Sequence, residues 1–258
     1  CATLFAIFSI DAKTPVDEPS PPEASHPLIF EFIIFIFVNI KSETTFMQNL
    51  TIPQEVAQHL LKIQAIQLRP DQPFTWASGW NSPIYCDNRV SLSFPEVRTY
   101  IKNCLSAAVK AYFPAADMIA GVATAGIAQG ALVADYLDLP FCYVRPEPKK
   151  HGMGNQIEGF VKPGQKAVLI EDLISTGGSS LKAAEALQQV GVDVLGMAAI
   201  FTYGFGIADE NFQNAGIPLV TLSSYDVLVE EAIKLNYISD TQLVTLQDWR
   251  VNPSTWGV

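Results

Sequence analysis

Apolar residues in the second half of the chain form short continuous runs that alternate with longer stretches at helical spacing. Strands separated by helices of this length are typical of parallel β-α-β units. We therefore predict an α/β core, a doubly wound and mainly parallel sheet flanked by helices, over residues 117–258. The strand-like runs lie at 116–122, 140–145, 166–173, 192–203 and 217–225, the clearest helical stretches at 126–137 and 179–191, and a last helix with an aromatic C-terminus within 239–258.

The region before this core has a different pattern. Thr51 is suited to cap a helix and Pro53 to its first turn, and apolar residues follow at helical spacing. The segment 74–89, FTWASGWNSPIYCDNR, is rich in turn residues and aromatics, and a second helix is expected from about 95 to 112. We expect residues 47–116 to form a small N-terminal hood at the edge of the sheet.

The first 46 residues differ in character from the rest. Residues 11–27 are polar and rich in proline, and such a composition cannot bury a core. Residues 28–40 are strongly apolar, but this run is shorter than the roughly 20 residues that span a bilayer, and it contains Glu31. We expect the domain to begin at Met47 and residues 1–46 to be a non-native or disordered extension. A membrane-associated segment at 28–40 is the alternative.

Composition and charge narrow the class of protein. Hydrophobic residues make up 49% and charged residues 16%, which is typical of a globular protein with a sizeable core. A net charge of -10 argues against a non-specific nucleic-acid binder. The cysteines are scattered without any C-x-x-C spacing, so we expect reduced thiols in a cytoplasmic protein, without a zinc site or disulfide scaffold. They are Cys1, Cys86, Cys104 and Cys142.

Two adjacent acids end one of the predicted buried strands, in VLIEDLISTGGSS at residues 168–180. Burying Glu171 and Asp172 side by side is costly unless a ligand with hydroxyls or a metal pairs with them. Small residues with free amides and hydroxyls follow just before a helix, an arrangement that holds a monophosphate. These are Ser175, Thr176, Gly177, Gly178 and Ser179. A sugar phosphate fits both features; the alternative is an ordinary strand-turn-helix with a polar cap.

Basic residues gather between two predicted strands, in YVRPEPKKHGMGNQIEGF at residues 143–160. In an acidic protein, the concentration of Arg145, Lys149, Lys150 and His151 indicates an anionic partner such as diphosphate. The glycines in this segment would let it close over a site. The alternative is a solvated connection whose charges have no role. A third segment, GVATAGIAQG at 121–130, could offer amides to another phosphate, but small-residue helix starts often reflect only tight packing.

These segments resemble the type I phosphoribosyltransferases, in which a strand, two acids and a small-residue phosphate loop follow one another. The pattern VLIEDLISTGGSS matches throughout. Residues 74–89 resemble the hood segment of orotate phosphoribosyltransferases, and RPEPKKHGMGNQIEG resembles their mobile catalytic loop. The resemblance runs from about Met47 to the C-terminus, and it implies the type I phosphoribosyltransferase fold.

The resemblance also implies roles for individual residues. Glu171 and Asp172 would bind the ribose hydroxyls, and Ser175 would also approach orotate. Lys149, His151 and Asp172 would be catalytic. Phosphoribosyl diphosphate would contact Arg145, Lys149, His151, Glu171, Asp172, Leu173, Ile174, Ser175, Thr176, Gly177, Gly178 and Ser179. Mg²⁺ would be held mostly by substrate oxygens and water, so no residue is assigned as a metal ligand. A homodimer with shared active sites, without nucleic acid or membrane, is expected.

The chain departs from the family pattern at several positions. Ala77 and Ala125 stand where many members have lysines, and Tyr203 stands where many have an arginine that contacts orotate. Pro146 replaces the basic residue that follows Arg145. These departures bear on base recognition more than on phosphoribosyl binding.

The reaction implied is Mg²⁺-dependent transfer of ribose 5-phosphate from phosphoribosyl diphosphate to orotate, which gives orotidine 5-phosphate and diphosphate. Two alternatives are a phosphoribosyltransferase for another base and a non-catalytic sensor of phosphoribosyl diphosphate. A sensor does not need the basic loop around Lys149, and no separate basic helix-turn-helix pattern is present.

Overall fold

The computed structural model describes residues 50–76, 79–147 and 156–257. The predictions for residues 1–46, and those for Ala77, Lys149, Lys150 and His151, lie outside the described residues. Within the unit Leu50–Val258, a six-stranded sheet forms the centre of the fold.

The central sheet has the strand order β10-β9-β8-β5-β6-β7. Its strands are parallel except for the short edge strand β7, which is antiparallel to β6. The middle strand, β5, pairs on both sides, and Ala120 lies opposite both Cys142 and Leu169. The strands are β5 (Met118–Val122), β6 (Phe141–Val144), β7 (Ile157–Glu158), β8 (Lys166–Ile174), β9 (Asp193–Thr202) and β10 (Leu219–Ser224).

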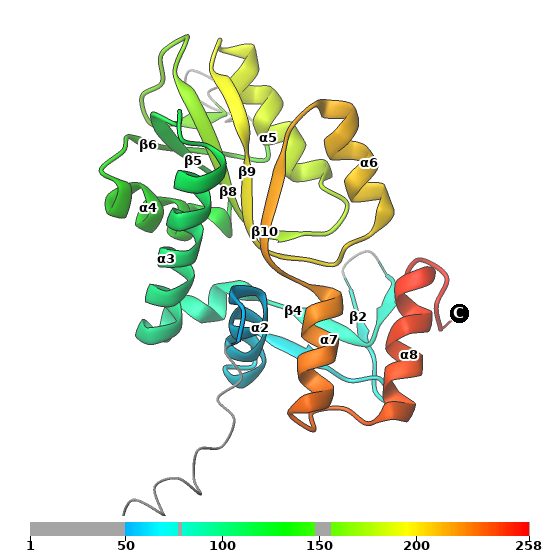
Figure 1. Cartoon of the computed structure of the whole chain (residues 1–258). Coiled ribbons are helices and arrows are strands. Elements are labelled where there is room, and N and C mark those ends of the chain that lie inside the picture. The colour runs from blue at the N-terminus through cyan, green and yellow to red at the C-terminus, as the bar shows by residue number, and fades with distance from the viewer. Residues whose placement is uncertain (1–49, 77–78, 148–155, 258) are drawn as a thin grey trace, which may run out of the picture. The chain divides into compact units, whose positions relative to one another are not determined.

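Helices cover both faces of this sheet (Figure 1). Helices α3 (Pro95–Tyr112) and α4 (Gly126–Leu137) pack in one apolar cluster with Ile119 of β5. Helices α5 (Gly178–Gln189) and α6 (Gly206–Ala215) pack in a second cluster with Met118 and Ala120. Because successive strand side chains point to opposite faces, a continuous apolar run is what a strand covered on both sides requires.

A smaller layer lies below the sheet in Figure 1 and is built from both ends of the described chain. Its N-terminal part holds two antiparallel strand pairs, β1–β4 and β2–β3. Helix α2 is tied to α7 through the buried Glu231, which accepts from Gln58 at 2.6 Å and from Lys234 at 2.7 Å. The elements are α2 (Ile52–Lys62), β1 (Ile66–Leu68), β2 (Phe74–Thr75), β3 (Asn81–Ser82), β4 (Ile84–Cys86), the 3-10 helix η1 (Asn88–Ser93), α7 (Tyr225–Lys234) and α8 (Asp240–Val251).

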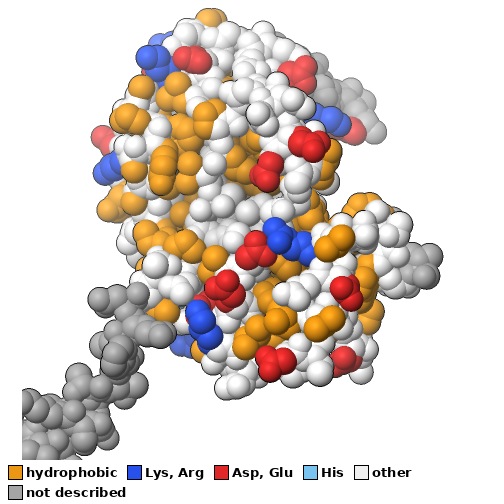
Figure 2. Space-filling model, turned by 45° about the vertical axis from the view of Figure 1, so that its right-hand side comes forward, with side chains coloured by type: hydrophobic (Ala, Val, Ile, Leu, Met, Phe, Trp, Pro, Cys, Tyr) orange, Lys and Arg blue, Asp and Glu red, His pale blue; other side chains and the backbone are white. Residues whose placement is uncertain are grey.

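The predicted α/β fold is confirmed. The helix expected at 126–137 coincides with α4, and the C-terminal helix expected within 239–258 is α8, whose Trp249 is fully buried. On the face drawn in Figure 2, acidic and basic side chains are interspersed, and hydrophobic side chains are spread among polar ones. None of the described helices has the length and apolar character needed to cross a membrane.

Candidate active site

The acidic pair lies at the carboxyl end of β8, where parallel strands place ligand-binding groups. Glu171 is buried, and it accepts a hydrogen bond from the Ser180 hydroxyl at 2.9 Å and another from the Asp172 main-chain N–H at 3.0 Å. Burial, followed by the neighbouring charge of Asp172, raises the pKa of Glu171 to about 8. Burial also raises the pKa of Asp172. Two carboxyl groups are thus held in a poorly solvated place where further positive charge would favour their ionised forms.

The small-residue loop turns directly from this strand into helix α5. Gly177 caps the helix with a left-handed backbone, φ +78°. A Cβ atom on Gly177 would lie 2.7 Å from Cε2 of Phe212, so α6 packs tightly beneath the loop. Asn211, also on α6, donates from Nδ2 to the carbonyl oxygen of Thr176 at 2.9 Å. The loop is therefore shaped by contacts from α6, and the amide end of α5 beside it favours an anion.

The turn between β5 and α4 lies at the same edge of the sheet. Ala123 donates its main-chain N–H to the carbonyl of Val144 at 2.9 Å, and the peptide bond between Ala123 and Thr124 is cis. A Cβ on Gly126 would collide with the carbonyl oxygen of Ile170 in β8. Glycine at this position lets the start of α4 lie against the strand that carries the acidic pair.

Arg145 follows β6 and stands at the base of the basic segment. Its main-chain N–H donates to the carbonyl of Gln156 at 2.9 Å, and Gln156 Nε2 donates back to the carbonyl of Arg145 at 3.0 Å. Its guanidinium lies 3.7 Å from the carboxylate of Glu158 on β7. Both ends of the segment that carries Lys149 and His151 are thereby fixed to the edge of the sheet.

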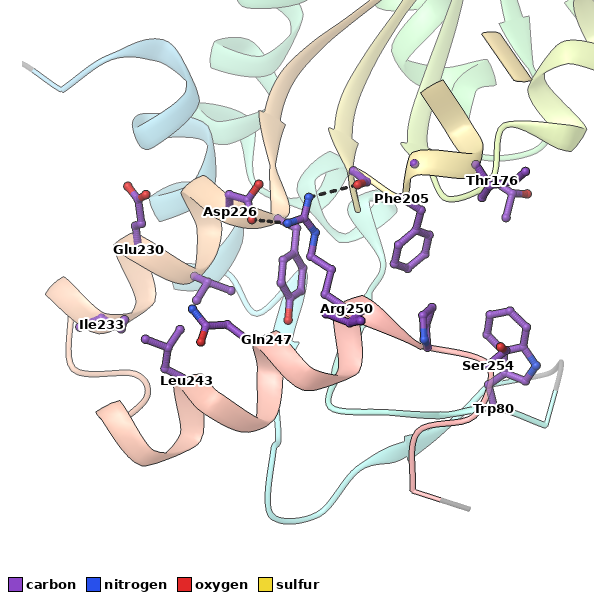
Figure 3. A pocket seen from close by; sticks show the side chains of 17 residues that line it. Trp80, Thr176, Phe205, Asp226, Glu230, Ile233, Leu243, Gln247, Arg250 and Ser254 are labelled. Carbon is purple, nitrogen blue, oxygen red and sulfur yellow. Dashed lines mark hydrogen bonds and ion pairs between the residues drawn. The ribbon is translucent and has the colours of Figure 1, made fainter. Parts of the chain in front are cut away.

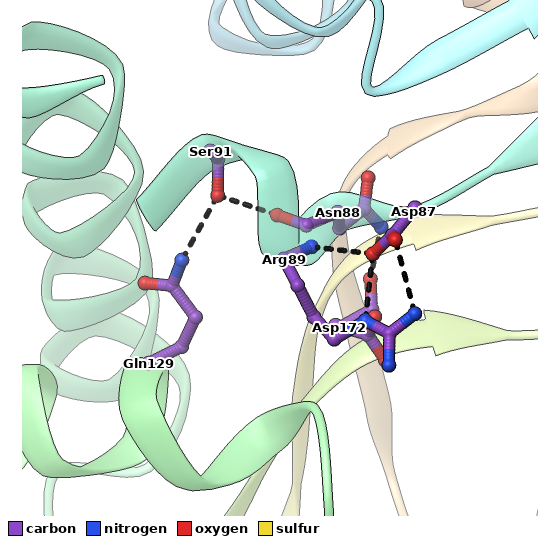
Figure 4. Close-up of polar contacts among 6 residues, drawn as sticks. All are labelled: Asp87, Asn88, Arg89, Ser91, Gln129 and Asp172. Carbon is purple, nitrogen blue, oxygen red and sulfur yellow. Dashed lines mark hydrogen bonds and ion pairs between the residues drawn. The ribbon is translucent and has the colours of Figure 1, made fainter. Parts of the chain in front are cut away.

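A second set of polar contacts joins the hood to the acidic pair (Figure 4). Asn88, at the start of η1, donates from Nδ2 to the main-chain carbonyl of Asp172 at 2.7 Å. Arg89 is paired with Asp87 at 2.7 Å, and its charge counteracts the effect of burial on the pKa of Asp172. Gln129 of α4 donates to the Ser91 hydroxyl at 3.2 Å. These contacts place a cation and a buried amide next to the acids.

A pocket of about 370 Å³ opens between the hood and the end of the sheet. Tyr203, which follows β9, is buried, and its ring centroid lies 5.5 Å from that of Trp76 in the hood. Ser175 of the loop lines the pocket as well. Aromatic walls with a few hydroxyl groups suit a flat polar ring. The lining residues are Thr75, Trp76, Tyr85, Cys86, Leu173, Ser175 and Tyr203.

A larger cavity of about 850 Å³ lies between α7, α8 and the turn after β9 (Figure 3). Arg250 projects into it from α8 and contacts Asp226 and the carbonyl of Gly204. Thr176 of the loop and Trp80 of the hood border its other side. The turn after β9 separates this cavity from the smaller pocket: Gly204, Phe205 and Gly206 line the cavity, and Tyr203 lines the pocket.

The structure brings most of the predicted site residues to one edge of the sheet. Glu171, Asp172, the loop at 175–179 and the turn at 123–126 lie at the ends of adjacent strands, and Arg145 lies at the end of the next strand. The sequence interpretation did not identify Asn88, Arg89 or Arg250 as parts of the site. The signal available was the polar CDNR end of the hood segment and the WR pair near the C-terminus.

Comparisons with known proteins agree on one family. A family described as phosphoribosyl transferase domain matches residues 92–214. The orotate phosphoribosyltransferase of Cytophaga hutchinsonii is 62% identical over 203 residues, which are 79% of this chain and 97% of that protein. That of Bacillus subtilis is 56% identical over 207 residues, 80% of this chain and 96% of that protein. The crystal structure of orotate phosphoribosyltransferase from Aeropyrum pernix matches with a TM-score of 0.63 and 29% identity, over 71% of this chain and 99% of that one.

Proposed function

The chain belongs to the orotate phosphoribosyltransferase family, and from this premise we propose how its residues carry out the reaction. The enzyme transfers ribose 5-phosphate from phosphoribosyl diphosphate to orotate, a step of pyrimidine biosynthesis, and the products are orotidine 5-phosphate and diphosphate. The assignment of residues rests on the order of these groups at the carboxyl end of β8. The acidic pair comes first, the phosphate loop follows at once, and a separate aromatic pocket lies beside both.

The phosphoribosyl group is proposed to bind along this strand end. The carboxylates of Glu171 and Asp172 accept hydrogen bonds from the ribose hydroxyls, and the 5-phosphate lies in the loop from Ser175 to Ser179. The amide groups before α5 and the positive end of the helix stabilise the phosphate charge. Leu173 and Ile174 connect the acidic pair to the loop. This short connection fixes the distance between the place of the ribose hydroxyls and the place of the 5-phosphate.

Orotate is proposed to occupy the pocket of about 370 Å³. Trp76, Tyr85 and Tyr203 offer ring faces to the flat base. No lysine or arginine is among the described residues that line the pocket, so the polar contacts come from the hydroxyl groups of Thr75, Ser175 and Tyr203. Tyr203 thus stands in the place of the arginine that contacts orotate in many family members.

Catalysis is proposed to rest on positioning and on stabilising charge as diphosphate leaves and an oxocarbenium-like ribose develops. The carboxylates of Glu171 and Asp172 lie next to that ribose and favour its positive charge. Arg145, and Lys149 and His151 in the segment that continues from it, neutralise the departing diphosphate. Orotate arrives ionised, so no strong general base is required.

A magnesium ion fits the chemistry of this site. Glu171 and Asp172 offer carboxylate oxygens, the ligands that Mg²⁺ prefers. In the part of the chain that the structure describes, no cluster of three or more acidic, histidine or cysteine side chains could hold a metal. Most ligands of the ion are proposed to be substrate oxygens and water. When bound, Mg²⁺ would neutralise charge on the diphosphate.

We also propose that the protein is a cytoplasmic homodimer. In this dimer, the basic segment that carries Arg145, Lys149 and His151 binds the diphosphate in the partner's site.

The test is an absorbance assay with the full chain, in which loss of orotate is followed in the presence of phosphoribosyl diphosphate and Mg²⁺. Adenine, hypoxanthine and uracil serve as competing bases. Turnover of orotate alone is expected. Turnover of another base but not of orotate would show that Tyr203 and its neighbours select a different ring. Folded protein that binds phosphoribosyl diphosphate without turning over any base would contradict the enzymatic assignment.

A further inference from the structure

Arg250, near the end of α8, makes three side-chain hydrogen bonds, two to the turn after β9 and one to α7. Its Nη2 donates to the carbonyl of Gly204 at 3.1 Å and its Nη1 to Asp226 at 2.7 Å (Figure 3). Its Nε donates to the carbonyl of Tyr203 at 3.2 Å. We propose that Arg250 is a positioning residue for the base: it holds the turn so that Tyr203 remains a wall of the 370 Å³ pocket. This inference rests on the proposed binding of orotate in that pocket.

The turn depends on this guanidinium because two of its carbonyl groups accept hydrogen bonds from the same side chain. Tyr203 N–H donates to Ile174 at 3.1 Å, and Gly204 N–H donates to the Thr202 hydroxyl at 3.0 Å, so the amides are already satisfied. The two carbonyls have Arg250 as their common donor. Hydrogen bonds from a charged donor are stronger than those between neutral groups, and the planar fork of arginine can bridge two acceptors.

Gly204 brings the guanidinium into direct contact with the main chain. Its backbone is left-handed, with φ +64°, and a Cβ at this position would lie 2.8 Å from Nη2 of Arg250. A side chain here would therefore displace the guanidinium. The absence of a side chain at Gly204 leaves room for the guanidinium of Arg250, and that guanidinium donates to the carbonyl of Gly204.

The rest of the surroundings hold Arg250 itself in place. Asp226 pairs with it from α7, and the guanidinium lies over the Tyr225 ring, 5.7 Å from the centroid. The Tyr225 hydroxyl donates to the carbonyl of Leu246 at 2.9 Å and so fixes α7 to α8. The pair with Asp226 is exposed, so its contribution lies in orienting the guanidinium more than in stability.

The neighbouring Trp249 links the same helix to both walls of the pocket. Its ring centroid lies 5.8 Å from those of Trp76 and Tyr203. Trp249 packs behind the two aromatic rings, whereas Arg250 fixes the main chain that carries one of them. The C-terminal helix therefore controls the shape of the base pocket from outside it, without lining it.

The experiment compares Arg250→Lys and Arg250→Ala with the parent chain. Lysine keeps the positive charge but lacks the planar fork with which arginine donates to both carbonyls and to Asp226 at once. We expect both variants to raise KM for orotate, by about tenfold in the alanine variant. KM for phosphoribosyl diphosphate should stay within about twofold of the parent value, because the bond from Asn211 to Thr176 that shapes the phosphate loop is untouched. The matched control is Asp248→Asn, which removes an exposed charge from the same helix. It should leave KM for orotate and KM for phosphoribosyl diphosphate unchanged.

Chemical rescue gives a readout that a purely structural role would not produce. Arg250 borders the cavity of about 850 Å³, from which a small cation can reach the vacated place. Guanidinium chloride at millimolar concentration should lower KM for orotate in Arg250→Ala, with no such effect in the parent or in Asp248→Asn. If the alanine variant does not fold, the split between the two KM values in Arg250→Lys remains the test.

Equal changes in both KM values, or no change in KM for orotate, would overturn the inference. The variant Tyr203→Leu distinguishes a failure of the positioning role of Arg250 from a failure of the base-pocket assignment. If Tyr203→Leu raises KM for orotate and Arg250→Lys does not, the pocket stands and the positioning role is wrong. If Tyr203→Leu also leaves KM for orotate unchanged, the pocket assignment and the positioning role fail together.

Discussion

The side chain of Asn88 donates a hydrogen bond of 2.7 Å to the main-chain carbonyl of Asp172, across 84 residues of sequence. Asn88 is almost fully buried at the start of η1, whereas Asp172 ends the strand that carries the acidic pair. The hood is thus attached to the main chain of a residue proposed to bind ribose. Because the bond is made to the carbonyl group, the Asp172 carboxylate remains available for a ligand.

Replacing Asn88 with alanine should loosen this attachment. The carbonyl of Asp172 would lose a partly buried partner, which typically costs about 1–3 kcal/mol in the free energy of unfolding. We expect KM for phosphoribosyl diphosphate to rise together with this loss, since the strand end is no longer held. Urea unfolding and steady-state kinetics measure the two effects. Asn103→Ala, an exposed asparagine on α3, is the matched control, and an equal response in both variants would contradict the role of Asn88.

Asp172→Asn tests the acidic pair directly. The amide keeps the shape of the side chain but removes the charge that accepts from ribose hydroxyls and attracts Mg²⁺, so we expect kcat/KM for phosphoribosyl diphosphate to fall by about 100-fold or more. The fold should be unaffected, because burial already disfavours the charged form and raises the pKa of Asp172. Asp193→Asn, exposed at the other end of the sheet, should retain parental kinetics. Near-normal turnover in Asp172→Asn would refute the assignment.

The parallel core could be predicted from the sequence because its physical requirements are local. A strand covered on both faces needs a continuous apolar run, and β8 (Lys166–Ile174) accordingly lies where the run at 166–173 was found. The helices α6 and α7 were not predicted. The pattern of α6 is weak, whereas α7 was missed although it buries residues at helical spacing, Tyr225, Leu228, Val229, Glu231 and Ala232. In α6, only Ala208 and Phe212 are buried, so the helix attaches through two side chains and leaves little periodic signal.

That the acidic pair and the small-residue loop lie side by side could be predicted, because one strand end and the helix start that follows it carry them. The contacts from Asn88 to Asp172 and from Arg250 to Tyr203 join residues that are 84 and 47 positions apart. Spacing along the chain does not encode such pairs, since they depend on how the hood and the C-terminal helix pack. The role of Tyr203 was likewise visible only as a departure from the family pattern.

Glu171→Gln should change how stability depends on pH. Burial and the neighbouring Asp172 raise the pKa of Glu171 to about 8 in the folded protein, whereas the unfolded chain releases this proton near the ordinary pKa of a glutamate. The folded state therefore binds more protons in this window, and the free energy of unfolding of the parent falls as pH rises from about 5 to 8.

Glutamine has no proton to lose. As pH rises through this window, the free energy of unfolding of Glu171→Gln should therefore increase relative to that of the parent, by about 1.4 kcal/mol for each unit by which the pKa of Glu171 is raised. Urea unfolding without substrates at several pH values in this window measures the difference. Glu210→Gln, which removes an exposed carboxyl group from α6, is the control for the loss of a charge. A difference between Glu171→Gln and the parent that does not vary with pH would show that the Glu171 carboxyl is ionised throughout.

Gly177→Ala should damage the phosphate loop in two ways. A left-handed backbone costs a residue with a Cβ about 1–2 kcal/mol, and the new methyl group would lie 2.7 Å from the buried ring of Phe212. Gly164→Ala isolates the first effect, because Gly164 has a similar φ of +84° and open space around its Cβ position. We expect Gly177→Ala to lower the free energy of unfolding more than Gly164→Ala does, and it alone should raise KM for phosphoribosyl diphosphate. Equal stabilities and equal KM values in the two variants would mean that α6 does not shape the loop.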